Sequence, residues 1–347
     1  MNEIILEDFN ILHDKYDVIF SSLNNSNILI TGANGMITTY FSEFMISLAE
    51  RYNIQLYFQV RNIEKAKEKF KDYTNIEYVH IVNFDFENNK IPDIKFDYII
   101  HAASPASTKQ FVECPVDVIS PNVIGTWNLL QYAKKTGVKK FLICSSNSIY
   151  GEGGISKNEL TENDYGIVNP LGERSSYIEA KRISEQMGVA FWRQYGVPVS
   201  IGRICHTYGP TFDLCRDDRI IPRVIKQILN NEDIIIYKDP NSVIQYTYIA
   251  DMVAAMLLVL VKGNSGEAYN LGGNEIVKMD DVIEWMVNAD PIITSKLIEK
   301  KIDSNYSFSK GKGVNFIRLS NDKLKSLGWE QLFSSKEGFY RTIMSYL

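Results

Sequence analysis

Short apolar runs alternate with longer segments of helical spacing through the first 204 residues of the chain. The runs have the length of buried strands, and they lie at 27–30, 55–60, 76–82, 96–101, 140–143 and 198–204. Strands that alternate with helices at this spacing are typical of a parallel sheet covered by helices on both faces. The pattern therefore predicts an α/β fold with a doubly wound parallel sheet.

The regions on either side of this pattern differ in character. Ahead of the first strand, apolar residues recur at spacings of four and three, which predicts a packed helix rather than a disordered tail. They are Ile5, Phe9, Leu12, Tyr16 and Ile19. Beyond Ile204 the alternation breaks, and we predict an amphipathic helix at 220–229, a short strand at 234–237 and a strand and turn at 268–273. No clean linker separates the two regions, so we expect them to be interleaved.

Composition excludes several classes of function. The 347-residue chain has a formal net charge of -5, which argues against nucleic-acid binding because that normally requires a basic face. The four cysteines form no Cys-x-x-Cys pair and the four histidines show no ligand spacing, so we expect reduced thiols and no metal. No apolar run approaches the roughly 20 residues of a membrane span, and the first residues resemble no secretory signal. We therefore expect a cytoplasmic protein that does not bind membranes.

A glycine-rich turn follows the first predicted strand. Gly32 and Gly35, with Asn34 and Met36 beside them, lead into a predicted helix that ends near Arg51. A Rossmann-type dinucleotide site begins with strand, glycine turn and helix in this order, because glycines let backbone N–H groups approach a pyrophosphate at the helix N-terminus. A plain strand-to-helix turn has the same local pattern, so the interpretation depends on the rest of the chain.

Residues at the ends of the next three strands would complete the dinucleotide site. Arg61 follows the second strand, where a carboxylate usually holds the ribose 2′-hydroxyl and an Arg can hold a 2′-phosphate, so NADP is favoured over NAD. Arg61 could instead be a solvated residue at a helix start. Asp85, after the third strand, could reach the adenine amino group or could cap a turn. Ala102 and Ala103, after the fourth strand, are small enough for the backbone to pass close to a cofactor.

The candidate chemistry lies between Ser145 and Lys181. Tyr177 and Lys181 are four residues apart, so on a helix they share one face. A nearby ammonium lowers the pKa of a phenol from about 10 toward the working range of proton transfer. Ser146, at a strand end, could hydrogen-bond the same substrate oxygen. Such a set moves a proton on or off a carbinol while a hydride leaves or arrives, although Tyr-x-x-x-Lys alone is more often a solvated helix face.

Taken together, these motifs resemble those of the extended short-chain dehydrogenase/reductase family of NAD(P)-dependent nucleotide-sugar epimerases, dehydratases and decarboxylases. The resemblance covers residues from about 27 to 273 and is most specific at 169–182. Together with 206–210 and 219–221, that stretch is most similar to the UDP-glucuronate decarboxylase branch.

The resemblance implies a role for each residue of the candidate site. Tyr177 would be the acid/base on the sugar 4-hydroxyl, Lys181 would bind the nicotinamide ribose and tune Tyr177, and Ser146 would be the strand-end hydroxyl. Asn122, in an Asn-x-x-Gly-Thr-x-Asn pattern, would support the helix geometry near the site.

Departures from the family pattern bear on the reaction. Thr38 replaces the third glycine of the turn, so we expect looser helix packing or a reshaped pyrophosphate site. The decarboxylases carry a Glu where this chain has Ser148, and the 4,6-dehydratases carry an Asp-Glu pair where it has Asn147 and Ser148. Because removing a proton from sugar C5 requires such a base, 4,6-dehydration is disfavoured. Ser104 and Ser148 are candidates for substrate binding.

Two basic residues are candidates for binding substrate phosphates. His206 stands where the family has an Asn that contacts the phosphate, and it could replace that donor or be a packed structural residue. Arg219 matches a basic residue of the family's substrate loop, and it could clamp a diphosphate or be an ordinary surface charge.

The predicted organisation has two parts. Residues 1–204 would form an NAD(P)-binding Rossmann domain, with 1–26 as an N-terminal extension. Residues 205–347 would form mainly a smaller, interleaved substrate-binding domain, with parts of about 236–271 returning to the Rossmann domain. Family members commonly pair through helices equivalent to the one that carries Tyr177, so we expect a homodimer.

The predicted activity is hydride exchange at C4 of a nucleotide-diphospho-sugar. A 4-ketoreductase would consume NADPH, whereas a 4-epimerase would retain NAD, and the residues leave both open. A nucleotide-sugar decarboxylase or 4,6-dehydratase is the alternative, and a non-catalytic dinucleotide-sensing protein is the alternative from another class. The family implies a role in making precursors of surface polysaccharides.

Overall fold

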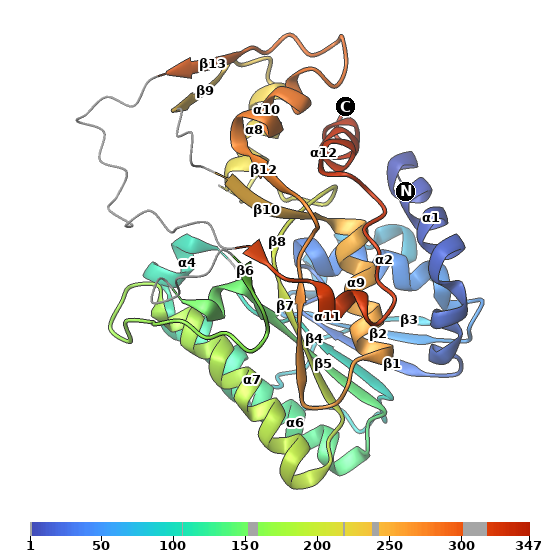
Figure 1. Cartoon of the computed structure of the whole chain (residues 1–347). Coiled ribbons are helices and arrows are strands. Elements are labelled where there is room, and N and C mark those ends of the chain that lie inside the picture. Colours follow the sequence, from blue (N-terminus) through green and yellow to red (C-terminus); the bar gives the residue numbers. More distant parts are fainter. Residues whose placement is uncertain (1, 106, 152–158, 218, 238–242, 301–317) are drawn as a thin grey trace.

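The computed structural model describes residues 2–105, 107–151, 159–217, 219–237, 243–300 and 318–347. Its centre is a seven-stranded sheet of order β11-β7-β5-β4-β1-β2-β3, in which every neighbouring pair is parallel (Figure 1). The strands are β1 Asn27–Thr31, β2 Gln55–Gln59, β3 Val79–Val82, β4 Tyr98–His101, β5 Lys140–Ser146, β7 Val199–Ile204 and β11 Glu267–Leu271. The predicted doubly wound parallel sheet is therefore confirmed. Strand order reverses between β1 and β4, which places a ligand crevice at their carboxyl ends.

Some strand bounds differ from the prediction. β3 begins at Val79 rather than at Ile76, because Ile76 takes part in a turn and accepts a hydrogen bond from the Val79 N–H. β4 begins at Tyr98 rather than at Phe96. β5 continues through Ser145 and Ser146, so the strand itself carries the candidate hydroxyl to the edge of the crevice.

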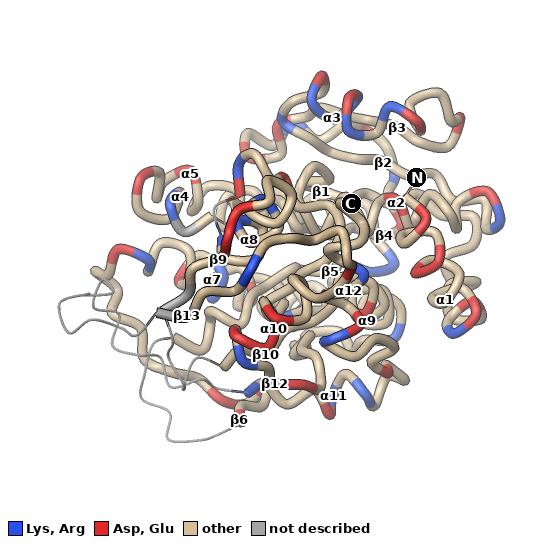
Figure 2. Tube along the Cα trace, turned by 90° about the horizontal axis from the view of Figure 1, so that it is seen from above, with Lys and Arg blue, Asp and Glu red and all other residues tan. Residues whose placement is uncertain are grey.

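Charged side chains of both signs are interspersed along the helices that surround the sheet (Figure 2). Within the described ranges, none of the helices combines the length and the apolar character needed to cross a membrane. Within the same ranges, no cluster of three or more His, Cys, Asp or Glu side chains is arranged to hold a metal ion.

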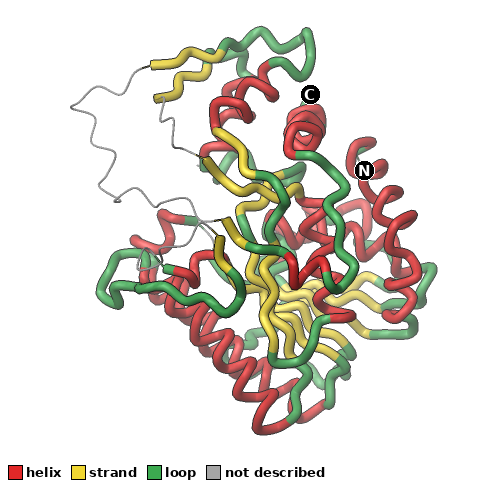
Figure 3. Tube along the Cα trace, viewed as in Figure 1, coloured by secondary structure: helices red, strands yellow, loops and turns green. Residues whose placement is uncertain are grey.

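Helices cover both faces of the sheet, as Figure 3 shows. Side chains alternate along β1, so that Ile28 and Ile30 join one apolar cluster and Leu29 joins the other. The first cluster is closed by α1 Glu3–Phe20, α2 Met36–Ala49, α3 Ile63–Lys69 and α9 Ile249–Lys262. The second is closed by α6 Thr126–Thr136 and α7 Ser175–Tyr195.

The N-terminal helix α1 has a clear packing role. Every residue of α9 from Ile249 to Leu260 is buried, and a helix that is apolar all round needs cover on every side. β5 and β7 cover its inner face, while α1 and α2 pack against it from outside. Residues 2–26 are thus an integral layer of the fold.

A buried carboxylate ties α1 to three other elements. Asp8 accepts hydrogen bonds of 2.7 Å from the hydroxyls of Tyr40 and Tyr248 and from Nε of Arg341. These partners come from α2, from the end of β10 Val243–Tyr248 and from α12 Ser335–Met344. Burial raises the pKa of Asp8, and the hydrogen bonds and the Arg341 charge oppose that rise.

The second part of the chain stands at the carboxyl end of the large sheet. It contains the three-stranded sheet β12-β10-β8 and the short parallel pair β13 with β9, and its strand β14 pairs in parallel with β6 of the first part of the chain. The remaining elements are α4 Thr108–Glu113, α5 Pro115–Ser120, β6 Glu159–Leu160, β8 His206–Tyr208, α8 Ile220–Leu229, β9 Ile234–Tyr237, β12 Ile276–Lys278, α10 Met279–Val287, β13 Leu297–Lys300, β14 Arg318–Leu319 and α11 Asp322–Lys325. Parts of about 236–271 were predicted to return to the Rossmann domain. In this stretch, β11 belongs to the large sheet and α9 to its helical layer, whereas 238–242 lies outside the described residues.

Candidate active site

The glycine turn brings the ends of β1 and β4 into close contact. Gly32 has φ +70°, and a Cβ on it would lie 2.8 Å from the Cα of Ala103. Gly35 is the N-cap of α2. Thr38, at the position of the family's third glycine, donates a 2.6 Å hydrogen bond to the Gly32 carbonyl. The departure from the family pattern at Thr38 therefore gives the turn an additional hydrogen bond.

A cavity of about 460 Å³ lies against this turn, at the crevice where the strand order reverses. Seven predicted residues line it, namely Gly32, Asn34, Gly35, Arg61, Ala102, Ala103 and Ser104. Asn34 Oδ1 is buried without a hydrogen-bond partner in the described part of the chain. Gly35 is exposed and Gly32 is partly exposed. This lining fits a dinucleotide, because N–H groups at a helix N-terminus and small side chains suit a pyrophosphate.

Two predicted cofactor residues line neighbouring cavities. Asp85 lines one of about 420 Å³ that shares Arg61 with the first. Asp85 also caps a turn, accepting hydrogen bonds from the backbone and side-chain N–H groups of Asn88, which lower its pKa. Met36 lines a cavity of about 210 Å³ together with Arg219.

Other residues that line the dinucleotide cavity were not predicted from the sequence. They are Gln59, Lys65, Phe86, Gln110 and Arg216, among others. Lys65 and Arg216 carry charge into it from α3 and from the loop before α8. No sequence pattern indicated Arg216, because its position depends on how the second part of the chain packs against the first.

The structure brings Ser146, Tyr177 and Lys181 together. Ser146 ends β5, while Tyr177 and Lys181 share one face of α7, and the side chains of Ser146 and Tyr177 are hydrogen-bonded. Lys181 is 5% exposed, and its ammonium donates a 2.7 Å hydrogen bond to the Cys144 carbonyl. The ammonium lies 5.8 Å from the centre of the Tyr177 ring.

Electrostatics at Tyr177 differ from the sequence prediction. Burial raises the pKa of Tyr177, and the hydrogen bond with Ser146 opposes that rise. Burial also lowers the pKa of Lys181 to about 8, although interactions with Cys144 and Glu185 favour its charged form. The prediction that Tyr177 has a lowered pKa is wrong for this structure, because desolvation dominates and the ammonium is directed at a backbone carbonyl.

An aromatic residue from the short helix α4 covers Tyr177. The rings of Phe111 and Tyr177 are stacked at 4.3 Å between centroids, with 15° between their planes. Ser176 donates a hydrogen bond to the Phe111 carbonyl. This contact fixes the plane of the phenol.

Two of the predicted substrate residues lie next to the catalytic set. Ser104 accepts a 2.9 Å hydrogen bond from Asn122, whose carbonyl in turn accepts one from Ser184 of α7. Asn122 thus connects the lining of the dinucleotide cavity to the helix that carries Tyr177. The backbone N–H of Ser148 donates a 3.1 Å hydrogen bond to Ser146 Oγ.

The two predicted phosphate residues lie on the second part of the chain. His206 begins β8, and its pKa is lowered by burial and further by Arg219 and Arg174. The residue is exposed to solvent, and its ring lies edge-on to the Tyr246 ring, with 6.0 Å between centroids. Arg219 forms a bidentate pair with Asp217 and lies over the Phe212 ring.

A parallel sheet with a glycine turn at its crevice defines a class, the dinucleotide-binding proteins of Rossmann type. The chain belongs to the NAD dependent epimerase/dehydratase family, whose model matches residues 28–272. The predicted family and the predicted nicotinamide dinucleotide are therefore confirmed. Solved structures of similar fold contain NAD, and the preference for NADP stays a prediction.

Individual proteins are similar over nearly the whole chain. UDP-glucuronic acid decarboxylase 3 of Arabidopsis thaliana is 30% identical over 321 residues, which cover 90% of this chain and 87% of that protein. UDP-glucuronic acid decarboxylase 1 of Xenopus tropicalis is 29% identical over 333 residues, covering 93% and 72%. UDP-glucose 4-epimerase of Thermotoga maritima has the same fold, with a TM-score of 0.77 at 24% identity, covering 92% and 98%.

Proposed function

We propose that the protein exchanges hydride at C4 of a nucleotide-diphospho-sugar, with Tyr177 as the acid/base. The convergence of Ser146, Tyr177 and Lys181 carries this proposal. Asn122 links the helix of Tyr177 and Lys181 to the dinucleotide cavity through Ser104. A non-catalytic dinucleotide sensor would have no use for such a proton-transfer set.

The residues supply the proton half of the reaction. When bound, the nicotinamide dinucleotide accepts the hydride from C4 or returns it. Tyr177 acts as the base in its phenolate form, after the phenol has released its proton to solvent. The phenolate takes the proton of the 4-hydroxyl as the hydride leaves, and the phenol so formed gives it back when the ketone is reduced. Ser146 hydrogen-bonds the same oxygen, and the Lys181 ammonium stabilises negative charge that develops on the phenol.

The cofactor separates a 4-ketoreductase from a 4-epimerase. The nucleotide released from protein purified without added cofactor and then denatured should be identified. Stoichiometric NAD or NADH indicates the epimerase, which regenerates its own cofactor. Empty protein that binds NADPH much more tightly than NADH indicates the ketoreductase, with Arg61 holding the 2′-phosphate.

A decarboxylase is the second candidate, because the similar proteins named above are UDP-glucuronic acid decarboxylases. Oxidation at C4 of such a substrate makes a β-keto acid, which can lose CO2 without a dedicated base. The chain departs from that branch at Ser148, where its members carry a Glu. After incubation with UDP-glucuronate and NAD, mass spectrometry of the sugar nucleotide detects loss of CO2, whereas NMR of the sugar ring detects inversion at C4, which leaves the mass unchanged.

A homodimer and a cytoplasmic role in polysaccharide precursor synthesis are further parts of the proposal. The helices α6 and α7 pack together and leave apolar side chains exposed nearby, with Ile124, Trp127 and Ile183 at 50%, 47% and 41%. Such a face is suited to a second copy of the chain. Sedimentation that shows only monomer at micromolar concentration would contradict the dimer.

A further inference from the structure

A buried ion pair lies behind the candidate catalytic set. Arg203 of β7 donates to both oxygens of Glu185 of α7, with Nη2–Oε2 at 2.9 Å and Nε–Oε1 at 3.1 Å. The two side chains are 10% and 12% exposed. Replacing such buried pairs with apolar residues is often neutral for stability, so stability alone gives a weak reason for this one.

Glu185 connects the two segments that carry the catalytic set. It lies four residues after Lys181 on the same face of α7, so its charge acts on the Lys181 ammonium. Its Oε1 accepts a 2.5 Å hydrogen bond from the hydroxyl of Ser145, the residue before Ser146 on β5. One carboxylate therefore holds the strand end of Ser146 against the helix face of Lys181.

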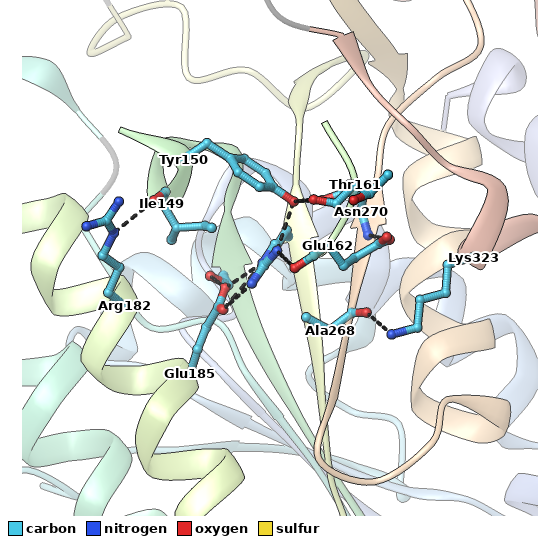
Figure 4. Close-up of polar contacts among 11 residues, drawn as sticks. Ile149, Tyr150, Thr161, Glu162, Arg182, Glu185, Ala268, Asn270 and Lys323 are labelled. Atoms are coloured by element: carbon cyan, nitrogen blue, oxygen red, sulfur yellow. Dashed lines mark hydrogen bonds and ion pairs between the residues drawn. The ribbon is translucent and has the colours of Figure 1, made fainter. Parts of the chain in front are cut away.

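Arg203 extends this network to the turn after β5. Its Nη1 donates to the hydroxyl of Tyr150 at 2.8 Å and to the carbonyl of Glu162 at 3.0 Å. Tyr150 in turn donates to Asn270 of β11 at 2.6 Å. Figure 4 shows Tyr150, Glu185 and Asn270 directed toward this cluster from separate parts of the chain. The turn that contains Ser148 is anchored by these contacts.

The charge of Glu185 matters for the Lys181 ammonium because the other titratable groups that interact with Lys181 are neutral. Cys144 of β5 is a neutral thiol at neutral pH, because burial raises its pKa to about 12. His101 of β4 is also neutral, because burial lowers its pKa to about 3. Tyr177 is a neutral phenol with a raised pKa. Among these four neighbours, Glu185 is the one that carries a charge opposite to the ammonium.

We propose that Glu185, clamped by Arg203, is a positioning residue that keeps Lys181 cationic and holds the Ser146 strand end in register with Tyr177. The role of this pair in turnover rests on the proposed function. The effect of Glu185 on the charge of Lys181 does not depend on the proposed function, so the role in turnover and the effect on Lys181 can be measured separately.

The test compares Glu185→Gln with Glu179→Gln in the full-length protein. Glu179 is on the same helix, with its side chain 45% exposed and 3.9 Å from Arg182, so the control removes an equal charge. The titration midpoint of Lys181 is followed by NMR of protein with ¹³C-labelled lysine, with the signal assigned by Lys181→Met. We expect Glu185→Gln to lower the midpoint and Glu179→Gln to leave it in place.

The pH profile of turnover provides the second readout. Because removing the Glu185 charge lowers the pKa of Lys181, the alkaline limb of kcat should move to lower pH by the same amount, with dinucleotide affinity retained. If Glu185→Gln does not fold, Glu185→Asp should give a smaller shift in the same direction, since it withdraws the charge by one methylene. An unchanged Lys181 midpoint in the folded variant overturns the proposal. A shifted midpoint without turnover in any form of the protein, wild type included, contradicts the proposed function alone.

Discussion

Replacing Gly32 with alanine tests whether close approach of two strand ends makes the dinucleotide site. The φ of +70° costs an alanine on the order of 1–2 kcal/mol. The new Cβ would lie 2.8 Å from the backbone Cα of Ala103, and overpacking of this kind costs roughly 1–3 kcal/mol. The expected loss of unfolding free energy is therefore about 3 kcal/mol, with weaker dinucleotide binding because the ends of β1 and β4 must separate.

Gly137 supplies a matched control. It ends α6 with φ +69°, and a Cβ there meets nothing within 4 Å. Gly137→Ala therefore has the same backbone cost of roughly 1–2 kcal/mol, without the steric clash. Urea unfolding followed by circular dichroism gives both free energies, and calorimetry gives the dinucleotide affinity. A Gly32→Ala variant that loses no more stability than Gly137→Ala, or that binds dinucleotide normally, would show that the close approach of the two strand ends does not make the site.

Three further predictions address the other parts of the molecule. Tyr177→Phe should reduce kcat by about 10²–10⁴-fold while dinucleotide binding measured by calorimetry is retained, and unchanged turnover would remove Tyr177 from the mechanism. Turnover should fall as pH rises through about 8, because Lys181 loses its proton there, and a rate that is flat from pH 7 to about 10 would contradict a need for the cation. Asp8→Asn should lower the unfolding free energy by roughly 3–5 kcal/mol, because buried Arg341 loses its buried anionic partner and keeps only the exposed Glu7. Asp14→Asn on the exposed side of α1 should change it little in the same urea experiment.

Much of the fold and part of the site could be predicted because they depend on neighbours in sequence. Alternating apolar runs identified six of the seven strands of the large sheet and the helix α1. The four-residue spacing placed Tyr177 and Lys181 on one face of α7, and the glycine turn located the mouth of the dinucleotide cavity. Each of these features depends on backbone geometry over a few residues, which local residue types largely determine.

The electrostatics of the site depend instead on segments that are distant in sequence. Lys181 donates to the Cys144 carbonyl, and burial raises the pKa of Tyr177, because β5 and α7 enclose both groups. Arg216 reaches the dinucleotide cavity from the second part of the chain. Glu185 meets Arg203 only because α7 packs across β7. Spacing along the chain carries no information about these distances. Desolvation likewise depends on all the atoms packed around a group, so the electrostatics of the site follow from the tertiary structure.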